Sequence, residues 1–261
     1  MSPLNRFQTK YWRNLYVRQF NLWLVLFCCD NNQALAANEL EELRPRLGNE
    51  WVQVQNDKRN DIRTYIRHED DKYFRSFKAD MRLDANIRTL ASVMLDFDNY
   101  TRWYWRTQTS ELLKKHSPTH YILYVVHDTP YNIPDLDVIL NAIVEPQSAS
   151  QAAVTIKVSA LPDYLPLKPT LKRMIAEDMS IKITPLPKNR VHLEVQGYFE
   201  VANTVLPTWA ANMIQRTAPY TVLTQLKKMV TLEHYQKANT PIGFAVYNYE
   251  EYQAQFNPAH P

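Results

Sequence analysis

The sequence predicts an α+β domain in which a curved antiparallel sheet wraps around a long C-terminal helix. Short runs of alternating apolar and polar residues lie on both sides of one amphipathic helical segment, and a long apolar helical segment follows the last run. The 261 residues are 45% hydrophobic and 22% charged, which is an ordinary globular composition. Because the chain has only three glycines, a glycine-rich phosphate-binding loop is nearly excluded.

The first 36 residues have the three parts of a secretory signal peptide. A basic segment without acids is followed by an apolar run at 22–29, and Ala34-Leu35-Ala36 has the form of a cleavage site. The apolar run is ~12 Å long as a helix, well short of the ~30 Å membrane core. We therefore expect cleavage after Ala36 and export, to the periplasm. An uncleaved anchor, or a lipoprotein processed at Cys28 or Cys29, are the alternatives.

Removal of residues 1–36 changes both the charge and the cysteine content. The leader holds four of the thirty basic and one of the twenty-seven acidic residues, so the rest of the chain has no net charge. A neutral chain gives no electrostatic reason to expect nucleic acid as a partner. Both cysteines also lie in the leader, which excludes thiol catalysis and cysteine metal sites in the mature chain.

The predicted domain extends from residue 37 to about 231. After a short polar helix at 37–47, strands are expected at 51–55, 62–68 and 73–83. Apolar residues recur at helical spacing over 84–96, with Asp84 as the expected N-cap, and a short helical or turn segment follows at 96–105. Six further strands are expected at 107–113, 121–127, 138–144, 153–160, 179–184 and 191–201. A sheet of this size is expected to curve.

The last periodic segment predicts a helix over 206–230. One of its apolar faces comprises Trp209, Met213, Tyr220 and Leu223. The adjoining face comprises Ala210, Ile214, Ala218 and Val222. A helix that is apolar over so wide an arc is buried along most of its length, and Pro219 is expected to kink or divide it. Residues 232–261 show no period, so we expect a loosely packed tail.

Five stretches of the chain carry a resemblance to a known family. They are Trp51 with DIRTYIRHE (61–69), FKADMRLDANIRTL (77–90), FDNYTRWYW (97–105), LPDYLPLKP (161–169) and LPTWAANMIQRTAPYTVLTQLKK (206–228). In this order and spacing they resemble the START family of lipid-transfer domains, its bacterial members in particular. The resemblance implies a helix-grip fold, in which a U-shaped sheet and the C-terminal helix enclose an apolar cavity for one lipid.

The resemblance also implies a lid. In START domains a loop between two late strands closes the cavity together with the helix, and here that loop would be Leu161–Ala176. Its prolines restrict its motion. Its apolar residues are Leu161, Tyr164, Leu165 and Leu167, and its basic residues are Lys168, Lys172 and Arg173. An open lid of this composition could rest transiently on anionic headgroups; the alternative is an ordinary proline-stiffened surface loop.

Candidate ligand-contacting residues follow from the same resemblance. Many START domains pair an acid with an arginine inside the cavity, and the matching positions here hold the neutral Thr109 and Asn141. This favours a ligand with a hydroxyl or carbonyl group over one with a phosphate. With Tyr121 and Tyr164, they are the expected polar groups of the cavity. The other expected lipid-binding residues are Trp103, Leu165, Trp209, Met213 and Tyr220. Each of these residues could instead be packed in the core or lie on the surface.

Catalytic motifs are not evident in the sequence. Neither H-E-x-x-H nor G-x-S-x-G occurs, and His116 and His120 flank a proline in an expected turn, which argues against zinc. His127 and Asp128 are neighbours at a strand end and should point to opposite faces. We therefore expect a non-catalytic lipid-binding or lipid-transfer protein without cofactor or metal. The alternatives are a helix-grip hydrolase or cyclase that uses the same cavity, and an interaction module that uses the tail from His234 to Pro261.

Overall fold

The computed structural model describes residues 50–129, 133–201, 206–237 and 242–257. The predicted signal peptide at 1–36, its alternatives at Cys28 and Cys29, and the helix expected at 37–47 lie outside the described residues. The expected domain, from residue 37 to about 231, is described from residue 50 on, apart from short gaps.

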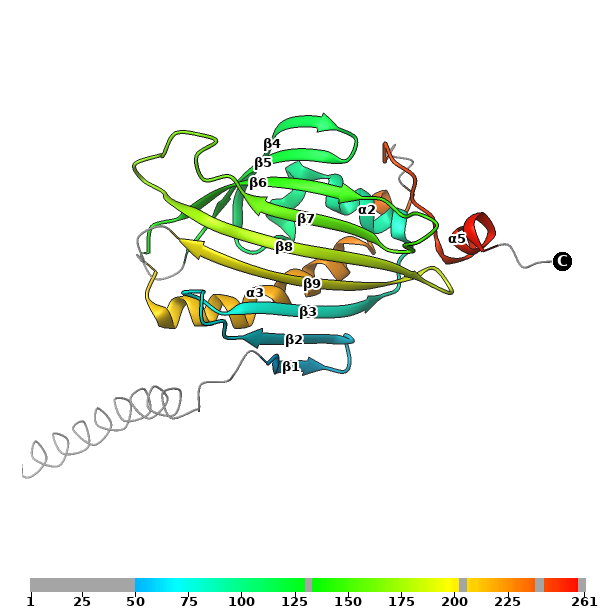
Figure 1. The fold of residues 1–261 in the computed structure, drawn as a ribbon, viewed down its shortest axis with the longest axis horizontal. Coiled ribbons are helices and arrows are strands. Elements are labelled where there is room, and N and C mark those ends of the chain that lie inside the picture. Colours follow the sequence, from blue (N-terminus) through cyan, green and yellow to red (C-terminus); the bar gives the residue numbers. More distant parts are fainter. Residues whose placement is uncertain (1–49, 130–132, 202–205, 238–241, 258–261) are drawn as a thin grey trace, which may run out of the picture. The chain divides into compact units, whose positions relative to one another are not determined.

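All nine strands of the described residues form one sheet, with the order β1-β2-β3-β9-β8-β7-β6-β5-β4. Their bounds are β1 Val52–Asp57, β2 Ile62–Arg67, β3 Ser76–Leu83, β4 Thr107–Ser117, β5 His120–His127, β6 Leu136–Glu145, β7 Val154–Ala160, β8 Lys172–Leu186 and β9 Arg190–Val201. Neighbouring strands are antiparallel, and one short parallel contact joins β6 to β8. Figure 1 shows the sheet in front of the long helix α3 (Thr208–Met229). The predicted α+β helix-grip architecture is confirmed.

Helix α2 (Ile87–Leu95) and the 3-10 helix η1 (Phe97–Arg102) follow β3. The expected N-cap of α2 was wrong: the cap is Asn86, whose Oδ1 accepts a hydrogen bond from the backbone N–H of Thr89 at 2.8 Å. Asp84 lies too far before Ile87 to reach that first turn. Helix α3 is continuous through Pro219, so it is not divided in two.

Strand β8 begins seven positions earlier than the sequence predicts. Residues 174–178 pair with the end of β9, from Met174 opposite Val201 to Asp178 opposite Tyr198, and residues 172 and 173 pair in parallel with β6. Charged residues in this stretch hide the apolar alternation that marks the rest of the strand. The expected lid loop is therefore shorter than Leu161–Ala176, because its last five residues belong to β8.

Buried apolar side chains form two clusters, one on each face of the sheet. The larger lies on the inner face, among the sheet, α2 and α3, and includes Leu123, Leu140 and Leu223. The smaller lies on the outer face of β5 and β6 and consists of Ile122, Tyr124, Val126 and Ile139. Leu161, Leu165 and Leu171 pack against this outer cluster. The loop after β7 therefore covers the outer face of the sheet.

The expectation of a loosely packed C-terminal tail was wrong for the described part of that segment. It forms the helices α4 (Glu233–Gln236) and α5 (Tyr249–Phe256), and Tyr235, Val246 and Tyr252 are buried. The Gln147 side chain accepts from the N–H and donates to the carbonyl of Tyr247. Single aromatic anchors of this kind leave no periodic signal in a sequence.

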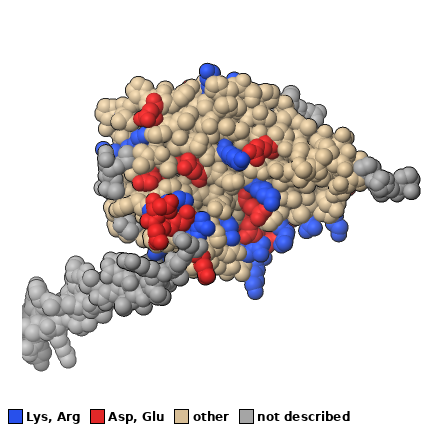
Figure 2. Space-filling model, in the orientation of Figure 1, with Lys and Arg blue, Asp and Glu red and all other residues tan. Residues whose placement is uncertain are grey.

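Charged side chains on the face shown in Figure 2 are mixed in sign. They gather over the lower part of that face, and much of the remainder is uncharged. None of the helices among the described residues combines the length and apolar character that crossing a membrane requires.

Candidate functional site

Two cavities lie on the inner face of the sheet. The first, which we call cavity 1, has a volume of about 100 Å³ and lies between α3 and the strands β3, β8 and β9. Its α3 wall consists of Ile214, Gln215, Ala218, Pro219, Val222 and Leu223. Cavity 2, of about 80 Å³, lies between α2, η1 and the strands β5 to β8, and Phe244 and Val246 of the C-terminal segment close it. The walls of both are largely apolar.

Tyr104 and Met179 line both cavities and so form the partition between them. Met179 meets Phe77 over Gly197, a β9 residue paired with both of them. A Cβ atom on Gly197 would lie 2.7 Å from Met179 Cγ and 2.7 Å from Phe77 Cζ. Glycine is thus needed here for both side chains to occupy the wall.

The cavities as they stand are small for a lipid. An engineered cavity of about 150 Å³ holds a molecule of the size of benzene, and cavity 1 is smaller than that. A ligand with a long chain therefore requires the Tyr104 and Met179 partition, or α3, to move.

Three buried polar side chains, His127, Glu177 and Gln215, line cavity 1 among apolar neighbours. Tyr104 contacts the first two of them. Glu177 Oε1 accepts a hydrogen bond from the Tyr104 hydroxyl, whereas Glu177 Oε2 has no hydrogen-bond partner among the described residues. His127 Nε2 lies 3.6 Å from this second oxygen. Gln215 is 2% exposed, and neither its amide oxygen nor its amide nitrogen has a hydrogen-bond partner in the described chain.

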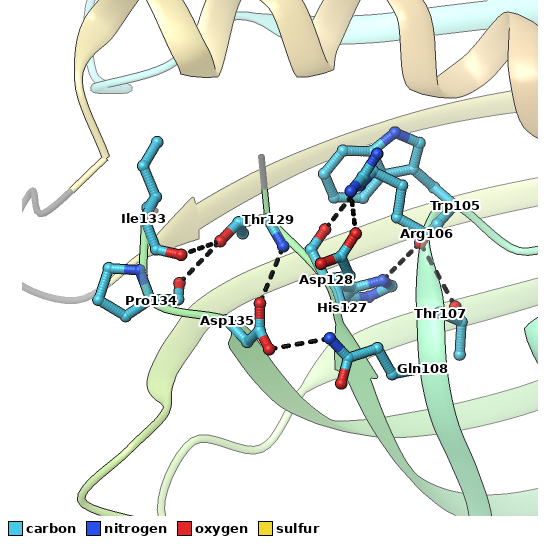
Figure 3. A network of polar contacts seen from close by, with 10 residues as sticks. All are labelled: Trp105, Arg106, Thr107, Gln108, His127, Asp128, Thr129, Ile133, Pro134 and Asp135. Carbon is cyan, nitrogen blue, oxygen red and sulfur yellow. Dashed lines mark hydrogen bonds and ion pairs between the residues drawn. The ribbon is translucent and has the colours of Figure 1, made fainter. Parts of the chain in front are cut away.

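The backbone fixes the orientation of the His127 ring. Its Nδ1 lies 2.7 Å from the carbonyl oxygen of Trp105, which also accepts from Thr107 (Figure 3). A carbonyl oxygen only accepts, so Nδ1 carries a proton and Nε2 is the atom that faces Glu177. Asp128 instead pairs with Arg106 (Figure 3), as expected for neighbours on opposite faces of a strand.

Tyr104 remains a hydrogen-bond donor over the whole physiological range. Burial, and then the nearby Glu177 charge, raise the pKa of the Tyr104 phenol well above its usual value. The phenol therefore keeps its proton and holds one oxygen of Glu177, which leaves the other oxygen facing the cavity.

The sequence did not indicate the pairing of His127 with Glu177. Glu177 falls between the predicted loop, which ends at Ala176, and the predicted strand, which begins at residue 179, and the neighbour of His127 in sequence is Asp128. A histidine and a carboxylate that share a cavity can bind a polar ligand group or exchange a proton with it. Among the described residues, no group of three or more His, Cys, Asp or Glu side chains is placed to hold a metal ion.

Three solved structures share this arrangement of sheet and helix. A STAR-related lipid transfer protein from Xanthomonas axonopodis (fragment 25-204) has a TM-score of 0.62 at 23% identity, over 70% of this chain and 99% of that one. Human StAR-related lipid transfer protein 5 has a TM-score of 0.61 at 13% identity, over 78% and 97%. Human STARD10 has a TM-score of 0.60 at 17% identity, over 75% and 78%.

The chain has the START fold. At these identities the likeness establishes the architecture and leaves the activity to be argued from the residues. No protein-family model and no curated protein sequence matches the chain.

Within the START fold, two of the sequence-predicted ligand residues line a cavity. Trp103 and Tyr121 both lie in the wall of cavity 2. The Tyr121 hydroxyl donates to the carbonyl of Pro118. The buried Trp103 Nε1 has no partner among the described residues. Their role in lipid binding stays a prediction.

Thr109 and Asn141 do not line either cavity, so their expected position inside was wrong. Thr109 pairs with Val126 and Asn141 pairs with Ile122, and residues directly opposite on neighbouring strands share a face. Val126 and Ile122 belong to the outer cluster. The Asn141 side chain instead lies 2.7 Å from His120 Nε2.

The apolar face of α3 that lines cavity 1 is the one adjoining the predicted stripe. Ile214, Ala218 and Val222 lie in the wall, whereas Trp209, Met213 and Tyr220 do not. Trp209 is 52% exposed, and the Tyr220 hydroxyl donates to Asp57 Oδ2 at 2.7 Å, at the β1–β2 turn. The sequence showed that α3 has two apolar faces, but it did not show which of them would line the cavity.

Tyr164 and Leu165 also lie away from both cavities, and the expected lid is fastened to the outer face. Arg173 is buried and forms two hydrogen bonds of 2.9 Å with Asp137. The same guanidinium donates to the carbonyls of Pro162, Leu165 and Pro166. Lys168 Nζ lies 4.4 Å from the ring centre of Tyr124. The buried Arg173 is thus engaged within the protein, so its expected contact with headgroups was wrong, whereas Lys168 remains exposed.

Proposed function

We propose that this chain is an exported, non-catalytic lipid-binding or lipid-transfer protein that holds one hydrophobic ligand on the inner face of its sheet. The observation that carries the proposal is the pair of apolar cavities enclosed by a START fold. The signal-peptide composition of residues 1–36 supports export.

The energetics suit exchange with a membrane. Moving a chain from water into such a cavity is favourable by ~0.8 kcal/mol per CH₂, but lipid tails are already apolar, so transfer from a bilayer is close to balanced. Reversible uptake then follows, and the buried polar groups decide which molecule is held.

Membrane contact is proposed through the exposed tip of the loop between β7 and β8. Tyr164 is 44% exposed and Leu167 is 72% exposed. Large apolar side chains that are exposed to this extent can enter the headgroup region. The buried Arg173 holds the rest of the loop, so only its tip is expected to insert.

Native mass spectrometry after incubation with vesicles made from host membrane lipids tests the proposal. We expect one bound lipid per chain. Ala218→Phe fills cavity 1 and should reduce the amount of bound lipid at least tenfold. Ala254→Phe, on the exposed surface of α5, is the matched control and should leave it unchanged. Leu167→Asp should slow transfer between vesicles while equilibrium occupancy stays the same. Absence of any bound lipid from the native chain contradicts the proposal.

A second candidate is an enzyme that acts on an apolar substrate in the same cavity, and the His127 and Glu177 pair favours it. The same spectra separate the two functions. A ligand released with unchanged mass supports binding alone. A released ligand whose mass differs from that of the lipid supplied supports catalysis, provided that His127→Gln still binds the lipid but releases it with unchanged mass.

A further inference from the structure

On the sheet side of cavity 1, one carboxylate oxygen has no hydrogen-bond donor among the described residues. Glu177 Oε2 accepts no hydrogen bond from the described residues, and His127 Nε2 lies 3.6 Å from it. That separation is beyond hydrogen-bond length, so the second carboxylate oxygen keeps free lone pairs whichever protonation state His127 adopts. With a neutral imidazole, both facing atoms are acceptors.

Gln215 brings the complementary groups from α3. Its side chain is 2% exposed and lines the same cavity, and both its amide atoms are without partners in the described chain. Buried polar groups are nearly always hydrogen-bonded, and a buried unsatisfied one destabilises a fold by roughly 1–3 kcal/mol. A ligand group that both donates and accepts would satisfy Glu177 and Gln215 together.

We propose that cavity 1 selects apolar molecules that carry a hydroxyl group, which donates to Glu177 Oε2 and accepts from the Gln215 amide. This inference rests on the proposed function and names its ligand class. A ketone or an ether only accepts, so it leaves Glu177 unsatisfied. A carboxylate or phosphate would place a second negative charge beside Glu177. Apart from His127 and the Tyr104 hydroxyl, the rest of the cavity wall is largely apolar.

Two isomers of equal size test the inference on the full chain. Octan-1-ol donates and accepts, whereas methyl heptyl ether only accepts. We expect NMR titration to show at least about tenfold tighter binding of the alcohol, because the ether leaves a buried carboxylate oxygen without a donor. Equal affinities overturn the inference and leave the proposed function intact; binding of neither isomer overturns both.

Variants identify the residues that carry the preference. In Glu177→Gln, the Tyr104 hydroxyl still donates to the amide oxygen, so the amide NH₂ faces the cavity and the alcohol preference should fall to near one. Gln215→Leu should weaken the binding of both isomers by a similar factor, because the Gln215 amide can donate to the alcohol oxygen and to the ether oxygen alike. Val222→Ala is the matched wall control and should leave the preference unchanged. A preference that survives Glu177→Gln in a folded variant means that the ligand hydroxyl donates to another acceptor, and it overturns the proposal.

Discussion

Asp137 and Glu177 are both buried carboxylates of the same sheet, but they differ in their hydrogen bonds. Asp137 receives two hydrogen bonds from Arg173 and one from the Tyr124 hydroxyl, on the outer face. Glu177 receives one, from Tyr104, and its second oxygen faces cavity 1. A fully bonded carboxylate fastens a loop, whereas a partly bonded one is available to a ligand.

A single irregularity in β8 separates these two environments. Arg173 and Glu177 are four residues apart, and in a regular strand they would share a face. The pairing of β8 with β9 contains a bulge between Met174 and Ala176. One extra residue shifts the alternation, so that Arg173 faces the outer side and Glu177 the cavity. The bulge therefore creates the polar end of cavity 1.

The largest expected effect comes from breaking the outer pair. Arg173→Met leaves Asp137 as a buried charge without its main partner, and we expect the free energy of unfolding to fall by about 3–5 kcal/mol in urea denaturation. The Arg173 and Asp137 side chains are only 3% and 1% exposed. Lys157→Met, which removes an exposed pair with Glu145, is the control and should lower it by about 1 kcal/mol or less. Similar losses in the two variants would show that Asp137 does not depend on Arg173.

A smaller effect is expected from the tyrosine that holds each carboxylate. Tyr104→Phe removes the one hydrogen bond that Glu177 accepts from the described residues and should lower the free energy of unfolding by about 2 kcal/mol. Tyr124→Phe leaves Asp137 with both Arg173 hydrogen bonds and should lower it by about 1 kcal/mol or less. Thermal and urea unfolding of the two variants measure the difference. If Tyr124→Phe is the more damaging, the contrast between the two carboxylates is wrong.

The sequence was sufficient for the sheet, the long helix and an apolar interior, because alternation and helical spacing are local patterns. It was insufficient for the polar end of the cavity. Glu177 and His127 are fifty residues apart, and only the strand pairing and the β8 bulge bring them together. Arg173 was assigned to headgroup contact for the same reason: its partner Asp137 lies on another strand. The predicted position of Thr109 and Asn141 inside the cavity was wrong because the face on which a strand residue lies depends on the strand register.

Asp57, at the end of β1, is a partly buried carboxylate, and its partner Tyr220 is one of the predicted ligand residues. The Asn60 side chain first, and then the Tyr220 hydroxyl, lower the pKa of Asp57 from 3.8 to about 2. A folded-state pKa below the unfolded value stabilises the protein above about pH 4, and the contribution is lost as the pH falls through about 2.

Tyr220→Phe should therefore lower stability slightly at neutral pH, by less than either buried tyrosine, and the difference from the native chain should shrink between about pH 4 and pH 2. Urea denaturation across this range measures it. Octan-1-ol binding should be unchanged, because Tyr220 joins α3 to the β1–β2 turn and does not line either cavity. If Tyr220→Phe instead loses ligand affinity and its change in stability does not depend on pH, Tyr220 is a ligand contact like Glu177 and Gln215. The expected pattern makes Tyr220 an anchor of α3, as Arg173 is an anchor of the outer loop.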